Sequence, residues 1–164
     1  NYKGMNISYS IDKEALGTGG AIKAALLKSN NKSIFIINGD TYFNVNLSYL
    51  CKIHNNNNND ITFSLKPMKN FDRYGFVKTD ANGRVHSLKE KKYCDYGEID
   101  GGVYLINKSI FNLIESKKKF SFNDFIVKNL GNIKVGSMLI DELFIDIGTP
   151  EDFKKAQKLL VNQL

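Results

Sequence analysis

The feature that most constrains the fold is the run Ser33-Ile-Phe-Ile-Ile-Asn-Gly-Asp40, an apolar strand that ends in a carboxylate. Four bulky apolar residues in succession are typical of a strand that is buried on both faces, as in a parallel sheet. Gly39 allows a tight turn, and Asp40 follows at the carboxyl end of the strand, where α/β sheets bind their ligands. A carboxylate in that place needs a cationic partner. The run therefore predicts a divalent metal ion that carries phosphate groups.

Length and composition indicate a single domain that spans residues 1–164. Hydrophobic residues make up 42% of the chain and charged residues 24%, which is ordinary for a globular protein. No apolar stretch approaches the roughly 20 residues of a membrane span, so no membrane association is expected. Cys51 and Cys94 lie far apart, which favours free thiols in a cytoplasmic protein over a zinc site.

The net charge is +6, and lysines cluster at Lys89, Lys91 and Lys92 and again at residues 117–119. Such clusters can meet nucleic acid, phosphorylated metabolites or only water. No aromatic residues interleave with these lysines, as a surface for single-stranded nucleic acid requires. We therefore expect no nucleic-acid partner, and we interpret residues 117–119 as solvated surface.

Strand and helix patterns alternate along the chain, which predicts an α/β fold with a largely parallel sheet. Asn82-Gly83 predicts a hairpin turn, Thr149-Pro150 predicts a helix start, and the asparagine tract at 55–59 is typical of a surface loop. The expected strands are 5–10, 33–38, 61–68, 75–79, 85–89, 99–106, 133–138 and 143–146; the expected helices are 19–28, 47–54, 109–115, 123–129 and one from residue 150.

The turn Leu16-Gly-Thr-Gly-Gly-Ala21 lies between a predicted strand and a predicted helix. Small residues let the backbone approach a ligand closely, and the helix start offers free N–H groups. The turn lacks the Gly-Lys-Ser/Thr ending of a P-loop. A ligand-binding turn and a purely structural turn both remain open.

Asp40 and Asp146 each follow a short apolar strand and each stand next to a turn with glycine. Carboxylates from neighbouring strand ends could share one Mg²⁺, with phosphate oxygens and water as the other ligands. Glu90-Lys91 could bind a sugar hydroxyl and a phosphate. The alternatives are turn-capping aspartates and a solvated ion pair.

Six motifs, taken in order, resemble those of the sugar-1-phosphate nucleotidyltransferases. They are Leu16-Gly-Thr-Gly-Gly-Ala, Asn38-Gly-Asp, Arg73-Tyr-Gly-Phe, Glu90-Lys91, Asp100-Gly-Gly-Val-Tyr and Asp146-Ile-Gly-Thr. Within that family the chain is similar to the small bacterial guanylyltransferases that act on D-glycero-D-manno-heptose 1-phosphate. That similarity depends on Ser8-Tyr-Ser-Ile-Asp-Lys-Glu and Pro150-Glu-Asp-Phe-Lys-Lys-Ala-Gln, and the whole chain is covered.

The resemblance implies a Rossmann-like nucleotidyltransferase sheet, mostly parallel and mixed at one side, with flanking helices. It implies that a sugar 1-phosphate attacks the α-phosphorus of a nucleoside triphosphate, GTP by the narrower similarity, and releases pyrophosphate. The nucleotide sugar would serve surface polysaccharide synthesis. By motif, the catalytic residues would be Asp40, Lys91 and Asp146, with Asp40 and Asp146 as the Mg²⁺ ligands; Gly17, Thr18 and Asp12 would bind the nucleotide, and Gly75, Glu90, Lys91 and Gly102 the sugar phosphate.

Two departures from the family pattern affect the expectations. Lys92 stands where the family has proline, which alters a loop. The family's first strands and the glycine-rich loop that wraps the triphosphate have no counterpart here, so the N-terminal strands are missing. We expect a fragment or a natural truncation that is inactive alone. The unpaired strand edge should make the chain unstable or aggregation-prone, unless swapping or association with another chain, for example in a homo-oligomer, completes its sheet.

Two other functions remain as alternatives. A non-catalytic domain that binds a nucleotide sugar or regulates a partner enzyme would retain the same motifs. A glycosyltransferase also pairs a nucleotide sugar with a metal ion, but such enzymes usually carry an Asp-x-Asp motif. Asn38-Gly-Asp40 has only one of the two acids.

Overall fold

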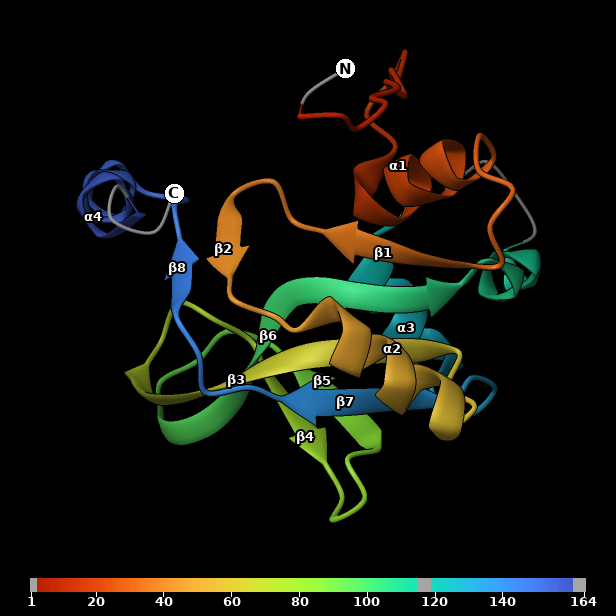
Figure 1. The fold of residues 1–164 in the computed structure, drawn as a ribbon. Helices are drawn as coiled ribbons and strands as arrows, with labels where there is room; N and C mark the ends of the chain where they lie inside the picture. Colours follow the sequence, from red (N-terminus) through yellow and green to blue (C-terminus); the bar gives the residue numbers. More distant parts are fainter. Residues whose placement is uncertain (1–2, 115–118, 161–164) are drawn as a thin grey trace.

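In the computed structural model, which describes residues 3–114 and 119–160, six strands form the main sheet and helices cover both of its faces (Figure 1). A separate two-stranded sheet, β2 with β8, stands at one end of the molecule next to the last helix. The elements, in order, are α1 (Gly17–Leu26), β1 (Ser33–Ile37), β2 (Thr41–Phe43), α2 (Leu47–Asn56), β3 (Ile61–Phe71), β4 (Phe76–Thr79), β5 (Val85–Lys89), β6 (Cys94–Asn107), the 3₁₀ helix η1 (Lys108–Leu113), α3 (Phe122–Asn129), β7 (Val135–Leu139), β8 (Phe144–Asp146) and α4 (Pro150–Leu160).

The long strand β6 organises the sheet, whose order is β5-β4-β6-β3-β7 with β1 also beside β6. Strand β6 runs antiparallel to β1, β3 and β4, and Ile106 lies opposite both Ile34 and Ile61. Among the paired strands of the described residues, only β3 and β7 run parallel. The expected α/β fold with flanking helices is therefore confirmed, but the expectation of a mostly parallel sheet is wrong. A hairpin joins β4 to β5, so these two strands run in opposite directions. Strand β6 lies between β1 and β3 and runs antiparallel to both.

Two predictions near the start of the chain also fail. Strand β1 forms as expected but is not buried on both faces: Ile37 is 57% exposed, because within the described residues β1 pairs with β6 alone. Residues 6–10 form no strand, and Ile7 and Tyr9 are exposed. No described strand lies beside this segment to supply backbone hydrogen bonds, so its alternating pattern is not enough to make it a strand.

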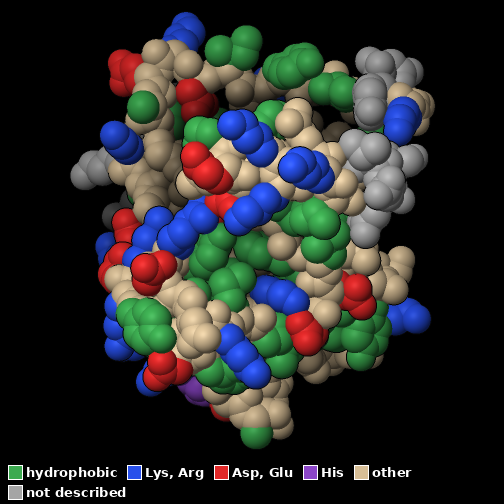
Figure 2. Space-filling view, turned by 90° about the vertical axis from the view of Figure 1, so that its left-hand side faces the viewer, with side chains coloured by type: hydrophobic (Ala, Val, Ile, Leu, Met, Phe, Trp, Pro, Cys, Tyr) green, Lys and Arg blue, Asp and Glu red, His purple; other side chains and the backbone are tan. Residues whose placement is uncertain are grey.

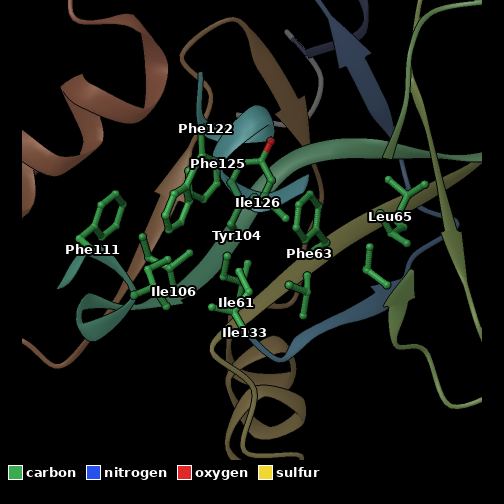
Figure 3. Packing of buried hydrophobic residues seen from close by; sticks show 14 of the residues in the cluster. Ile61, Phe63, Leu65, Tyr104, Ile106, Phe111, Phe122, Phe125, Ile126 and Ile133 are labelled. Atoms are coloured by element: carbon green, nitrogen blue, oxygen red, sulfur yellow. The ribbon is translucent and has the colours of Figure 1, made fainter. Parts of the chain in front are cut away.

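The core consists of one apolar cluster on each face of the sheet. Phe63, Tyr104 and Ile106 point to the face covered by α1 and α3, where Phe122 and Ile126 pack on them (Figure 3). Residues of β6 that alternate with these, such as Val103 and Leu105, belong to the second cluster with Leu50 of α2. Side chains on a strand alternate between faces, so one strand builds both clusters.

A network of polar side chains lies beside the core, around the buried His54. His54, which is 2% exposed, lies 2.9 Å from the Thr62 hydroxyl through Nδ1 and 3.1 Å from Asn107 Oδ1 through Nε2. The Asn107 amide donates to the carbonyl oxygen of Asn59, so its oxygen faces His54 and Nε2 carries the proton. Asn59, expected in a surface loop, is buried and donates to Thr62. The asparagine tract is therefore partly structural.

Helix α4 begins as the sequence predicts. The Thr149 hydroxyl accepts a hydrogen bond from the backbone N–H of Asp152, and Pro150 is the first helical residue. Among residues 3–114 and 119–160, no helix has the length and apolar character needed to cross a membrane. Lys117 and Lys118 of the predicted basic cluster lie outside the described residues, whereas Lys119 is exposed.

Candidate functional site

The structure brings Asp40 and Asp146 to one end of the small sheet. Strands β2 and β8 pair antiparallel with Thr41 opposite Asp146, and the N–H of Ile147 donates to the carbonyl oxygen of Asp40 at 2.9 Å. The two residues therefore lie on neighbouring strand ends, and a metal ion shared by their carboxylates stays a prediction. The pairing is antiparallel, so Asp40 precedes its strand and Asp146 ends the partner strand.

The two carboxylates differ in how firmly they are held. Asp146 Oδ1 accepts a hydrogen bond from the N–H of Gly148 at 2.8 Å, and Oδ2 lies 3.7 Å from Arg73 Nη2. Burial, and next the charge of Asp146 and a hydrogen bond to it, raise the pKa of Tyr74 to about 12. Asp40 is exposed, and its side chain forms no hydrogen bond or ion pair with another described residue. Asp146 is therefore pre-positioned, whereas Asp40 is open to solvent.

Arg73 connects this pair to the first turn of α4. Its Nη1 donates to Asp152 Oδ2 at 2.6 Å, and the Thr149 hydroxyl donates to the same oxygen at 2.8 Å. The hydrogen bond from Arg73, followed by the one from Thr149, lowers the pKa of Asp152. On this face of the molecule, Lys and Arg side chains lie interspersed with Asp and Glu side chains (Figure 2).

The donor set fits Mg²⁺. Carboxylate oxygens are hard ligands, and Mg²⁺ is usually held by one or two carboxylates together with substrate phosphates. Within residues 3–114 and 119–160, no group of three or more His, Cys, Asp or Glu side chains is close enough to hold a metal ion. Asp40 and Asp146 are therefore suited to a metal ion that arrives with phosphates, and not to one enclosed by protein ligands alone.

The glycine-rich turn forms the start of α1 and packs closely on residues 120–122. Gly17 has φ +70°, and a side chain there would lie 2.6 Å from the carbonyl oxygen of Phe120. The Thr18 hydroxyl accepts a hydrogen bond from the N–H of Phe122 at 2.9 Å. These contacts explain the small residues structurally, and nucleotide binding by Gly17 and Thr18 stays a prediction.

Thr18 also lines a cavity of about 270 Å³ that contains the partly buried acid Asp100. Asp100 accepts hydrogen bonds from the Tyr104 hydroxyl at 2.6 Å and from the N–H of Gly102 at 2.9 Å. Burial is the main cause that raises the pKa of Asp100. Asp100 was expected only as part of the motif Asp100-Gly-Gly-Val-Tyr and not as a site residue. An acid inside an otherwise apolar strand was the signal that marked it.

The candidates for the sugar phosphate lie on two adjoining segments. A side chain at Gly75 would come within 2.5 Å of the carbonyl oxygen of Lys89, so these backbones are in close contact. Glu90 and Lys91 directly follow β5 and are exposed. Lys92 Nζ lies 5.4 Å from the ring centre of Phe76, a cation–π contact that ties the same two segments together.

Gly102 and Asp12 complete the predicted set. Gly102 is buried in β6, and a side chain there would meet the Asn38 amide at 2.7 Å. Asp12 lies in the exposed stretch before α1, and no hydrogen bond or ion pair joins it to another described candidate. The structure thus gathers Asp40 with Asp146 and Gly75 with the Glu90 segment, and it leaves Asp12 apart.

Comparison with known proteins identifies the family. The family model for nucleotidyl transferases matches residues 1–163. The chain belongs to the nucleotidyl transferase family. This confirms the family that the six motifs predicted.

Relatives of this nucleotidyl transferase include two bacterial proteins named D-glycero-alpha-D-manno-heptose 1-phosphate guanylyltransferase. The one from Aneurinibacillus thermoaerophilus is 48% identical over 160 residues, which are 97% of this chain and 69% of the relative. The one from Campylobacter jejuni is 45% identical over 152 residues, 93% of this chain and 66% of the relative. Among solved structures, HddC from Yersinia pseudotuberculosis complexed with GMP-PN superposes with a TM-score of 0.79 at 31% identity, over 92% of this chain and 65% of that one. The chain therefore spans about two thirds of the length of these relatives.

Proposed function

We propose that this protein transfers a guanylyl group from GTP to a heptose 1-phosphate, giving a GDP-heptose and pyrophosphate. The observation that carries the proposal is the 48% identity to a heptose 1-phosphate guanylyltransferase across almost the whole chain. The adjoining Asp40 and Asp146 supply the chemistry that such a reaction needs. The product would be an activated sugar for surface polysaccharide synthesis, made in the cytoplasm, where GTP is available.

The candidate residues divide the work of the reaction. Asp40 and Asp146 would hold Mg²⁺, which when bound neutralises phosphate charge and stabilises the transition state. Lys91 would bind the sugar phosphate as a point charge, and Glu90, Gly75 and Gly102 would orient the sugar. Gly17, Thr18 and Asp12 would contact the nucleotide. Catalysis would come from positioning and charge neutralisation, as in phosphoryl transfer in general.

Ligand binding is the primary test, because it reports on the candidate site without requiring turnover. Calorimetry should show saturable binding of GDP-heptose that is roughly tenfold weaker without Mg²⁺ and in an Asp146→Asn variant. Asp141→Asn is the matched control, since Asp141 carries the same charge on the surface and is 82% exposed. No binding, or binding that is indifferent to Mg²⁺ and to Asp146→Asn, would contradict the proposal.

Pyrophosphate release from GTP and D-glycero-D-manno-heptose 1-phosphate then separates the remaining functions. Rapid release by the 164-residue chain would overturn the expected inactivity of the chain alone and would support the proposed reaction. Hydrolysis of GDP-heptose to GDP would instead support a glycosyltransferase. Tight binding of GDP-heptose without any release of pyrophosphate would favour a non-catalytic sensor of nucleotide sugars.

A further inference from the structure

Arg73 lies between two carboxylates and is bound firmly to only one of them. Its Nη1 is 2.6 Å from Asp152 Oδ2, a charge-assisted hydrogen bond, whereas its Nη2 is 3.7 Å from Asp146 Oδ2, beyond hydrogen-bond distance. The first acid belongs to α4 and the second ends β8. The guanidinium has therefore been drawn toward the helix and away from the candidate metal ligand.

Asp152 is well placed to retain the guanidinium. The Thr149 hydroxyl donates to the carboxylate oxygen that Arg73 binds, and the N–H of Asp152 donates back to Thr149 at 3.2 Å. This reciprocal pair resembles a capping box and fixes the side chain at the start of α4. The helix N-terminus also favours a negative charge at this position.

Arg73 has room to move when that partner is lost. Its side chain is 46% exposed, and its other neighbour is the ring of Tyr74, 5.8 Å from the guanidinium carbon. A shift of about 1 Å would bring Nη2 within hydrogen-bond distance of Asp146 Oδ2. In that position the arginine would occupy a metal-binding oxygen and would repel an arriving cation.

We propose that Asp152 is a positioning residue: by holding Arg73 in a hydrogen bond it keeps the Arg73–Asp146 ion pair long, so that a divalent cation can compete for Asp146 Oδ2. The proposal rests on the proposed function, because that function assigns the metal ion to Asp40 and Asp146. It assigns Arg73 and Asp152 a role that does not require either residue to contact the cation. It also predicts that removal of Arg73 restores the Mn²⁺ affinity that Asp152→Asn lowers.

Mn²⁺ affinity, measured by electron paramagnetic resonance on the full chain, tests this role without turnover. Asp152→Asn keeps the shape of the side chain but removes its charge, and it should weaken Mn²⁺ binding roughly fivefold. Arg73→Gln should bind Mn²⁺ at least as tightly as the wild type. The double variant should return to within about twofold of Arg73→Gln, because the competing cation is then absent. Glu151→Gln is the matched control, since it removes the same charge from the same helical turn, and its Mn²⁺ affinity should match the wild type.

Two results would overturn the proposal. One is an Asp152→Asn variant that binds Mn²⁺ as Glu151→Gln does. The other is a weakened Asp152→Asn variant that removal of Arg73 does not rescue. Wild-type Mn²⁺ binding that survives Asp146→Asn would overturn the metal assignment and the proposal together.

Binding of GDP-heptose to the wild type, measured in parallel, keeps the two claims apart. If the wild type binds GDP-heptose but Asp152→Asn does not change the Mn²⁺ affinity, only the role of Asp152 is contradicted. If the Mn²⁺ affinities change as expected but GDP-heptose does not bind, the role of Asp152 is supported and the proposed function is contradicted.

Discussion

The molecule contains two polar networks that obey different rules. In the network around His54, the side chains of Thr62, Asn59 and Asn107 form hydrogen bonds with His54, with one another or with the backbone. The network around Arg73 is charged and partly exposed, and Arg73 hydrogen-bonds Asp152 but forms only a longer ion pair, of 3.7 Å, with Asp146 Oδ2. Polar groups that already form their hydrogen bonds within the protein are not available to bind a ligand. The second network is incomplete, and this makes it suited to bind one.

The difference predicts opposite responses to mutation. Buried polar groups are costly to leave without partners, so damage to the His54 network should appear as lost stability. Exposed ion pairs contribute little to stability, so damage to the Arg73 network should appear in metal binding. Single substitutions in each network can therefore separate stability from metal binding.

His54→Ala should destabilise the protein by about 3 kcal/mol, because it opens a cavity and leaves Thr62 and Asn107 without partners. In a protein of this length that loss lowers Tm by roughly 10 °C, which calorimetry would detect. Mn²⁺ affinity should not change. His86→Ala is the control, since His86 is 58% exposed, and equal Tm values for the two variants would break the comparison.

Asp146→Asn should show the reverse pattern. Loss of a direct carboxylate ligand should weaken Mn²⁺ binding at least roughly tenfold. Tm should change by no more than about 3 °C, because the asparagine oxygen can still accept the hydrogen bond from Gly148. A large loss of Tm with unchanged Mn²⁺ affinity would assign Asp146 to the structure and not to the site.

Asp100 combines features of the two networks, because it is partly buried and carries a carboxyl group like that of Asp146. Burial raises its pKa in the folded state, so the charged form costs stability as the pH rises through that raised pKa. Asp100→Asn should therefore raise Tm at pH 7, by roughly 3 °C. The gain should disappear as the pH falls through the raised pKa toward 3.8, the ordinary value for the unfolded chain. A gain that persists in acid would contradict the electrostatic explanation.

Asp152 should show the smallest effect on stability, with the opposite dependence on pH. The hydrogen bonds from Arg73 and Thr149 lower its pKa, so its contribution is present above 3.8 and is lost as the pH falls through the lowered value. We expect Asp152→Asn to change Tm by at most about 2 °C at pH 7. The difference from the wild type should vanish at the acid end of a scanning-calorimetry series. A difference that grows in acid would show that the ion pair is not its cause.

The sequence predicted the parts of the structure that depend on local patterns. Thr149-Pro150 marked the start of α4, Asn82-Gly83 the hairpin turn, and the two aspartates lie on neighbouring strand ends as expected. The direction of the strands was not predictable in the same way. An apolar run such as Ser33–Ile37 predicts a strand, but it does not show whether the neighbouring strand runs parallel or antiparallel to it. Both polar networks were also missed. Arg73 and Asp152 are 79 residues apart, and His54 and Asn107 are 53 apart, so no local spacing marks either pair.

The central claim is that Asp40 and Asp146 together hold the cation that carries the nucleotide phosphates. Anomalous diffraction from crystals grown with Mn²⁺ and GDP-heptose tests it most directly. The account predicts one Mn²⁺ peak about 2.2 Å from a carboxylate oxygen of each aspartate, with the diphosphate bound to the same ion. A nucleotide sugar bound elsewhere, or a metal ion that contacts neither aspartate, would contradict it.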